Sequence, residues 1–416
     1  MSLDTETRVK ADLWSGIFVG PVVKRLLGCL KIGKVTVRTP NGATIDHQTG
    51  RPGPEATVVL YRWRALRRLL AGGDIAFAEA YMDGDWSSPD LPALLELAAA
   101  NIAEIEHTIT GLLPVRLFNR ARHLLNSNSR RGSRKNIAFH YDLGNDFYRL
   151  WLDPSMTYSS ALYRADSDTL EQAQENKLDR IAELLAPPPG GDILEIGCGW
   201  GALAARLGKT GSNVKGVTLS TEQLAYARDV AEKIGVDDQV KLELQDYRDC
   251  QGTFDRIVSI EMLEAVGEQY WPLYFNKLRQ LLKTDGKAVL QVITIDDSRF
   301  EPYRRNPDFI QRYIFPGGML PTKALIASHA ENAGLTLVAS EYFGQSYART
   351  LAEWRTRFRQ NSGAMQTLGF DHRFRRLWNY YLAYCEAGFR AGTIDVGLFV
   401  FEPDRSDIQV HREPPR

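Results

Sequence analysis

A short glycine-rich segment, ILEIGCGWG at residues 193–201, carries the clearest chemical signal in the chain. Its apolar start predicts a strand, and Gly197, Gly199 and Gly201 predict a turn that leads into a helix. Glycine lets the backbone approach a ligand closely, and the unpaired N–H groups of a helix N-terminus attract negative charge. The segment therefore predicts a site for a nucleotide-like cofactor, although the pattern alone also suits dehydrogenases.

Three details separate the cofactor classes. The spacing is GxGxG, without the later glycine of the dinucleotide-binding fingerprint. Glu195 precedes the first glycine by two residues, where its carboxylate could meet the amino group of a methionine moiety. The second strand ends in Thr218-Leu219-Ser220, with no acidic residue for a ribose diol. These details favour S-adenosyl-L-methionine over a nicotinamide cofactor.

The segments around this turn alternate between strand and helix patterns. The strand-like runs are DILEIGC, VKGVTLS, KLELQD, FDRIVSIEM and GKAVLQVITI, and helical runs such as ALAARLGKTG and TEQLAYARDVAEKIG lie between them. Such alternation predicts a parallel sheet covered by helices on both faces. The expected fold class is α/β, a Rossmann-like doubly wound sheet of the S-adenosylmethionine-dependent methyltransferase type with a small N-terminal α+β domain.

The rest of the chain suggests three parts. Residues 1–125 combine strand patterns (KVTVRTPNG, ATVVLYRW) with helical ones and predict a small α+β domain. Residues 126–136 are polar and basic, which is typical of a solvated linker, with attraction to anionic lipid headgroups as the alternative. Residues 137–416 form the expected catalytic domain.

Composition restricts the classes of partner and location. Lys+Arg and Asp+Glu both number 51, which argues against a large basic surface for nucleic acid. The cysteines are far apart and predict neither disulfides nor a metal site: Cys29, Cys198, Cys250 and Cys385. No apolar run reaches the roughly 20 residues of a membrane-spanning helix, and the polar N-terminus does not resemble a signal peptide. We therefore expect a cytoplasmic protein.

A series of ordered motifs resembles one family. HYDLGNDFYRLWLDPSMTYSSALY precedes the glycine-rich segment, and GVTLSTEQLAYA, LQDYRD, FDRIVSIEMLEAVG and RYIFPGGMLP follow it in order. Together they are similar to the bacterial cyclopropane-fatty-acyl-phospholipid synthases and the mycolic acid methyltransferases. The likeness covers roughly residues 130–405. The N-terminal region resembles the extra domain of the phospholipid-acting members, which implies that residues 1–125 form an N-terminal lipid- or substrate-associated domain.

The resemblance implies contacts for S-adenosyl-L-methionine. Tyr158 and Ser159 of the TYS motif would close over the cofactor, and the turn from Gly197 to Gly201 would hold its methionine end. The TLSTEQ motif, with Thr218, Leu219 and Gln223, would face the ribose, while Asp246 and Tyr247 of QDYRD would meet the adenine. For Tyr158 and Tyr247 the alternative is ordinary aromatic packing, and Cys198 inside the turn fits packing better than chemistry.

The resemblance also implies the reaction. Family members transfer the sulfonium methyl group to a carbon of a cis double bond in an acyl chain, and a base then removes a proton. In typical cyclopropane synthases a bound bicarbonate is that base, and a Cys, a Glu, a His and a Tyr hold it. Glu264 and Tyr347 match two of these residues, whereas Ser160 replaces the cysteine and Ile293 the histidine. The product is therefore open between a cyclopropane and a methyl or methylene branch, with or without bicarbonate.

Two further residues have open roles. Glu261 stands where the usual synthases carry glycine; it is either a surface or capping carboxylate, or a neighbour on the same helix face that raises the pKa of Glu264. Cys385 matches a C-terminal cysteine sometimes proposed as catalytic, and a buried structural thiol is the alternative.

The expected partners are unsaturated phospholipid acyl chains. The enzyme would associate peripherally with the inner face of the membrane, with headgroups meeting arginines: Arg62, Arg64, Arg67, Arg68, Arg130, Arg131 and Arg134. No nucleic acid is expected, and a homodimer is one option for the oligomeric state. A reading from another class, a lipid-binding protein with a decayed active site, conflicts with the intact glycine-rich segment and with Glu264 and Tyr347.

Overall fold

The computed structural model describes residues 23, 26–102, 104–105 and 143–404. These residues cluster into two compact units. The first contains the described parts of Met1–Arg122, Arg305–Arg312 and Leu351–Thr393, and the second those of His123–Arg304, Tyr313–Thr350 and Ile394–Arg416. Segments from the predicted catalytic region, 137–416, thus belong to both units. The predicted linker at 126–136, the boundaries beside it, and Arg130, Arg131 and Arg134 lie outside the described residues.

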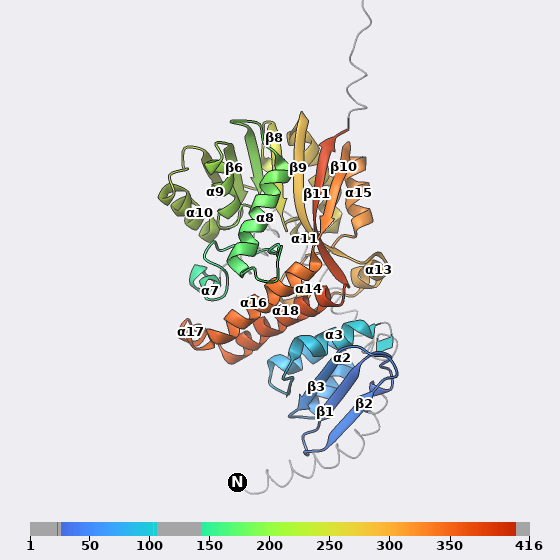
Figure 1. Ribbon diagram of the computed structural model, residues 1–416. Coiled ribbons are helices and arrows are strands. Elements are labelled where there is room, and N and C mark those ends of the chain that lie inside the picture. The colour runs from blue at the N-terminus through green and yellow to red at the C-terminus, as the bar shows by residue number, and fades with distance from the viewer. Residues whose placement is uncertain (1–22, 24–25, 103, 106–142, 405–416) are drawn as a thin grey trace, which may run out of the picture. The chain divides into compact units, whose positions relative to one another are not determined.

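The first unit combines a small sheet with helices from three parts of the chain (Figure 1). Its strands, in the order β2-β1-β3-β4, are β1 (Lys34–Arg38), β2 (Thr44–Gln48), β3 (Glu55–Leu60) and β4 (Trp86–Ser87). β1 and β3 run parallel, and the other pairs are antiparallel. The helices are α2 (Arg64–Met82), α3 (Leu91–Ala100), α14 (Phe309–Tyr313), α17 (Ser362–Thr367), α18 (His372–Arg390) and the end of α16 (Gly344–Gln360).

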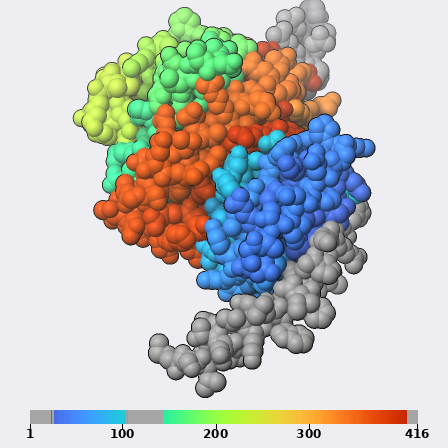
Figure 2. All heavy atoms as spheres, turned by 60° about the horizontal axis from the view of Figure 1, so that its bottom comes forward, coloured from blue at the N-terminus to red at the C-terminus, as the bar shows by residue number. Residues whose placement is uncertain are grey.

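Helix α18 is tied to the N-terminal segment by hydrogen bonds, and Figure 2 shows side chains of the two segments meeting on the surface. Arg376 donates to the backbone carbonyls of Tyr81, at 2.5 Å, and Trp86, at 2.8 Å. Asn379 donates to the Tyr81 hydroxyl at 2.8 Å. Because the arginine satisfies one carbonyl in the last turn of α2 and one just after the helix, it links residues that are far apart in the sequence within one packed unit.

The second unit contains a seven-stranded sheet in the order β10-β11-β9-β8-β5-β6-β7 (Figure 1). The strands are β5 (Asp192–Ile196), β6 (Asn213–Thr218), β7 (Val240–Leu244), β8 (Phe254–Ile260), β9 (Leu282–Ile295), β10 (Leu335–Tyr342) and β11 (Ile394–Pro403). β5 to β9 pair in parallel, and β11 pairs antiparallel with both β9 and β10. This arrangement confirms the predicted doubly wound α/β fold.

Helices cover both faces of this sheet. They are α7 (Asn145–Arg149), α8 (Leu170–Leu185), α9 (Ala202–Lys209), α10 (Thr221–Lys233), α11 (Leu263–Val266), α12 (Trp271–Leu281), α13 (Asp297–Arg305) and α15 (Lys323–Asn332), with short 3-10 turns at Tyr247–Asp249 and Glu268–Tyr270. Successive strand residues point to opposite faces, so Ile193 of β5 packs with α8, α9 and α10, whereas Leu194 packs with α12 and α15. Two apolar cores therefore hold the sheet between them.

Candidate active site

The glycine turn joins β5 to α9 through backbone conformations that side chains disfavour. Gly197, Gly199 and Gly201 have φ of 84°, 51° and 87°. The N–H groups of Gly197 and Cys198 both donate to the carbonyl of Val217, at 2.9 and 3.1 Å, which ties the turn to β6. A Cβ at Gly199 would meet no atom within 4 Å, so the turn presents bare backbone to open space.

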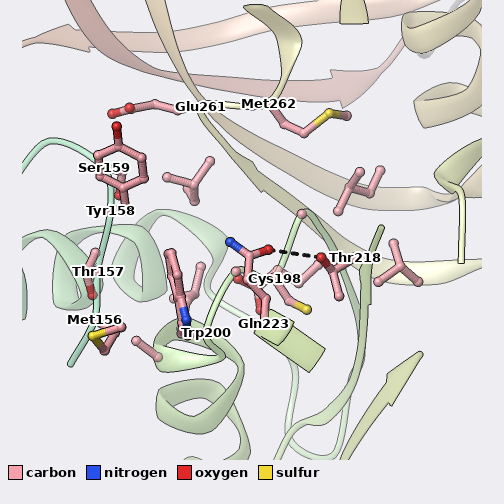
Figure 3. A pocket seen from close by; sticks show the side chains of 18 of the residues that line it. Met156, Thr157, Tyr158, Ser159, Cys198, Trp200, Thr218, Gln223, Glu261 and Met262 are labelled. Carbon is pink, nitrogen blue, oxygen red and sulfur yellow. Dashed lines mark hydrogen bonds between the residues drawn. The ribbon is translucent and has the colours of Figure 1, made fainter. Parts of the chain in front are cut away.

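That space is a pocket of about 1070 Å³, including its open mouth, at the carboxyl ends of β5, β6 and β8. Ligands bind at this edge of open α/β sheets. Predicted cofactor residues that line it are Tyr158, Ser159, Glu195, Gly197, Cys198, Gly199, Thr218, Leu219, Gln223 and Tyr247. Figure 3 shows many of the lining side chains, with the 3.1 Å hydrogen bond from Thr218 Oγ1 to Gln223 Oε1 on the side away from Glu261.

Two predicted cofactor residues do not line the pocket. Gly201 allows close packing of the turn on α10, because a Cβ there would lie 2.8 Å from the Cβ of Ala227. The Asp246 carboxylate forms an ion pair of 2.6 Å with Arg248, and both side chains are buried. Asp246 therefore holds the QDYRD segment in place, while Gln245 and Tyr247 of the same segment reach the pocket.

Glu195 is a buried carboxylate with an unmet hydrogen-bonding need. It is 3% exposed, and its Oε2 has no hydrogen-bond partner among the described residues. Burial raises its pKa to about 8, against the opposing charge of Lys177. An acceptor of this kind beside a bare glycine turn fits the ammonium group of the methionine moiety, so the residues suit S-adenosyl-L-methionine.

Lys177 is a pocket residue that the sequence reasoning missed. Its side chain comes from α8, is 1% exposed, and donates to Ser159 Oγ at 2.7 Å. Burial lowers its pKa to about 8, while Glu261, Asp153 and Glu195 act in the opposite direction. Gln174, one turn earlier, donates to the carbonyls of Thr157 and Ser159 at 3.3 and 3.0 Å. Helix α8 therefore fixes the TYS segment. In the sequence, the one sign of a functional role for Lys177 is a charged residue on the buried face of an amphipathic helix pattern.

Aromatic rings support the same segment. The Tyr158 ring lies 5.5 Å from that of Tyr148 and 5.3 Å from that of Trp151, and Tyr148 also contacts Trp200 at 5.0 Å. The Trp200 Nε1 donates to the Asn145 side chain at 2.7 Å. Tyr158 therefore packs against other aromatic rings and also lines the pocket.

Glu261 occupies a strained position at the end of β8. Its φ is 49°, in the left-handed region that costs a non-glycine residue roughly 1–3 kcal/mol. Its carboxylate accepts three hydrogen bonds: from the Ser160 N–H at 2.8 Å, the Gln291 amide at 2.7 Å and the Tyr347 hydroxyl at 2.7 Å. We call these four residues, together with Glu264, the acid corner.

These contacts correct the surroundings that the sequence suggested for Glu261. It is neither a surface nor a capping carboxylate, and it does not share a helix face with Glu264, because α11 begins only at Leu263. The expected electrostatic effect on Glu264 is confirmed: burial and the charge of Glu261 together raise the pKa of Glu264 to about 8. Burial also raises the pKa of Glu261, and its donors and Lys177 oppose that shift.

The other predicted catalytic residues have different surroundings. Glu264 accepts a short hydrogen bond from the Ile293 N–H, and its Oε2 has no partner among the described residues. The Ser160 hydroxyl donates to the Ala161 carbonyl at 2.9 Å, so Ser160 serves Glu261 through its backbone. Cys385 lies on α18 in the first unit, and a catalytic role for it stays a prediction.

Comparison with known proteins identifies the family. The model described as mycolic acid cyclopropane synthetase matches residues 128–399. The chain belongs to this family. One relative, "Tuberculostearic acid methyltransferase UfaA1" of Mycobacterium tuberculosis, is 40% identical, and the alignment covers 84% of each chain. "Cyclopropane-fatty-acyl-phospholipid synthase" of Escherichia coli K12 is 36% identical over 81% of this chain and 85% of its own length.

Solved structures agree with this assignment. The mycolic acid cyclopropane synthase CmaA1, solved in complex with SAH and CTAB, has a TM-score of 0.61 and 33% identity. The alignment covers 64% of this chain and 97% of CmaA1. This synthetase-family chain is thus an S-adenosylmethionine-dependent methyltransferase of the cyclopropane synthase type. In the described part of the chain no helix combines the length and apolarity needed to cross a membrane.

Proposed function

We propose that the enzyme transfers a methyl group from S-adenosyl-L-methionine to the cis double bond of an unsaturated fatty acyl chain in a phospholipid. One observation carries this proposal: the pocket that fits the donor also contains the Glu261 carboxylate, held by three donors beside a second buried acid. A proton acceptor at that place suits a reaction in which an alkene is alkylated and a proton must then leave. The Escherichia coli synthase, similar over most of both chains, supports the phospholipid as substrate.

The chain's own residues would perform three tasks in this reaction. The glycine turn and Glu195 orient the donor, whose sulfonium supplies an electrophilic methyl group. The Tyr158 ring, packed against Trp151, presents an aromatic face that can stabilise a developing carbocation. The buried walls exclude water, which would otherwise capture the cation.

A second candidate product is a methyl- or methylene-branched acyl chain. The surroundings of Glu264 support this candidate, because Ile293 offers only a backbone N–H, and that group already donates a hydrogen bond to Glu264. The 40% identical relative whose name specifies a tuberculostearic acid methyltransferase points the same way. A ring and an exocyclic methylene group have the same atomic composition, so mass alone does not separate them.

We also propose that the enzyme binds the membrane surface peripherally. Arg62 and Arg64 share the buried carboxylate of Asp85, at 3.1 and 2.8 Å, yet their side chains are 62% and 45% exposed. Together with the exposed Arg67 they offer positive charge to anionic headgroups. Replacing Arg62 and Arg67 with glutamine should weaken binding to vesicles of anionic phospholipid, and the effect should fade at high salt; unchanged binding would contradict this role.

The test of the reaction is direct. Purified enzyme is incubated with methyl-labelled S-adenosyl-L-methionine and vesicles of oleoyl or vaccenoyl phospholipid, and the fatty acids are analysed by mass spectrometry and proton NMR. We expect label in the acyl chain, and NMR then distinguishes ring protons from vinylidene protons. Labelled donor consumed without labelled acyl chains, or no transfer to any cis-unsaturated phospholipid, would refute the proposal.

A further inference from the structure

The acid corner gathers donors from three distant parts of the chain onto one side chain. The Ser160 N–H follows the TYS segment, Gln291 belongs to β9, and Tyr347 belongs to α16. All three donate to Glu261, whose backbone is held in a left-handed conformation. A strained residue with such support marks a place where the side chain is needed, because a glycine would adopt the same backbone without strain.

The geometry also leaves the carboxylate one acceptor site. An ionised carboxylate offers about four lone-pair positions, and the three donors use three of them. Glu261 lines the pocket, whereas Glu264 does not belong to the pocket wall. Lys177, also in the wall, adds a positive charge that favours the ionised form of Glu261. Of the two acids, Glu261 is therefore the one that accepts three hydrogen bonds and also lies within reach of a ligand.

We propose that Glu261 is the resident base of the reaction and takes the place of an external anion such as bicarbonate. This inference rests on the proposed methyl transfer. Bicarbonate and a carboxylate share a planar O–C–O group, and Glu261 delivers that group from the protein itself. Ser160 and Tyr347, which the family resemblance assigned to bicarbonate, bond instead to Glu261.

The step balances without any further reactant. Once the methyl group is bonded to one alkene carbon, the other alkene carbon carries the positive charge. Glu261 accepts a proton from the transferred methyl group, and the C–H electron pair forms the third bond of a ring. Alternatively, a hydride first moves from the methyl-bearing carbon to its cationic neighbour, and the same electron pair then forms an exocyclic double bond. In both cases the proton leaves Glu261 for water, and nothing is oxidised or reduced overall.

The acidity of the cation makes position more important than base strength. Protons next to a carbocation are far more acidic than a carboxylic acid, so a carboxylate stabilised by three donors still accepts one. What the acid corner provides is a fixed oxygen at the place where the proton leaves.

Chemical rescue tests the role of Glu261. In buffer freed of carbon dioxide, we expect wild-type turnover to stay unchanged, Glu261→Gln to lose at least about 100-fold, and Glu261→Gly to lose as much. Adding bicarbonate or formate should restore Glu261→Gly, because glycine fits the backbone and leaves the three donors free. It should not restore Glu261→Gln, whose amide fills the site. The control Glu232→Gln, on the exposed face of α10, should behave as the wild type.

A binding measurement decides the matter without turnover. We expect ¹³C-labelled bicarbonate to show no specific binding to the wild-type protein by NMR and to bind Glu261→Gly. Wild-type protein that binds bicarbonate, or that loses turnover without it, would overturn the inference; so would a Glu261→Gln variant with full turnover. If the wild type consumes donor but labels no lipid, the proposed function fails, while the binding result still shows whether Glu261 fills the anion site.

Discussion

The two ends of the pocket are built in different ways. At the glycine turn, Glu195 and the three glycines lie within a few positions of one another, and local backbone conformation places them. At the acid corner, residues 160, 261, 291 and 347 meet only because the sheet and helices bring them together. The first end can keep its function as long as the turn keeps its shape. The second depends on the whole unit, so substitutions there should couple stability and chemistry.

The largest effect should come from Lys177, which links the two ends. Lys177→Met removes the cation that is buried beside Glu195, Asp153 and Glu261. Removing one partner of a buried charge group costs about 3–5 kcal/mol. Urea unfolding at neutral pH should show a loss of this size, and donor binding should weaken too.

A matched substitution calibrates this result. Lys287→Met breaks a partly exposed ion pair with Glu402, whose atoms are 3.8 Å apart, and should cost about 1 kcal/mol or less. Equal losses for the two lysine variants would show that Lys177 has no special role.

The acid corner should make stability depend on pH through Glu264. Its pKa is about 8 in the folded protein against an ordinary value of 4.5, so the folded state retains a proton that the unfolded chain releases. Stability is thus fully present below pH 4.5 and falls as the pH rises toward 8. Glu264→Gln should be more stable than the wild type by roughly 2–4 kcal/mol at pH 8, with no difference at pH 4. Parallel stability curves for the two proteins would contradict this assignment.

At the donor end, the affinity for S-adenosyl-L-methionine should depend on pH. Here the carboxylate has to be ionised to act, whereas ionised Glu264 destabilises the fold. Glu195, with a pKa of about 8, must lose its proton to pair with the donor's ammonium group. Affinity for S-adenosyl-L-methionine should therefore rise from pH 6 to pH 8. Glu195→Gln should bind about 10–100-fold more weakly at pH 8 and show a flat profile in titration calorimetry. A wild-type affinity that is constant over this range would separate Glu195 from donor binding.

The smallest expected effect is a difference in stability between two alanine substitutions within the glycine turn. Gly201→Ala brings a Cβ to 2.8 Å from Ala227 at a φ of 87°, whereas a Cβ at Gly199 meets nothing within 4 Å. We expect Gly201→Ala to lower the free energy of unfolding by about 1–2 kcal/mol more than Gly199→Ala does. Gly199→Ala should instead lower donor affinity, and reversed effects would mean that the two glycines have exchanged roles.

The sequence was sufficient for the local parts of this molecule. The glycine turn, Glu195 two residues before it, and the alternation of strands and helices are all short-range patterns, and the structure shows each of them. The position of β11 between β9 and β10 is a pairing between distant segments, and no local pattern specifies it.

Glu261 and Lys177 show why the other parts of the site could not be predicted from the sequence. Glu261 and Glu264 are three positions apart, which suggested one helix face, but the left-handed φ of Glu261 separates them. Lys177 drew no prediction from the sequence, because its burial depends on tertiary packing, including its contact with Ser159 of the TYS segment. In both cases tertiary contacts override the local pattern.

The left-handed backbone at residue 261 also suggests how reaction outcomes can diversify within one scaffold. A backbone conformation that accepts either hydrogen or a carboxyethyl side chain at the same Cα would let an ancestral enzyme gain or lose its built-in proton acceptor by one replacement. No strand needs to shift and no loop needs to be rebuilt. The dependence on dissolved carbon dioxide, and with it the response to cellular metabolism, would then change in a single evolutionary step.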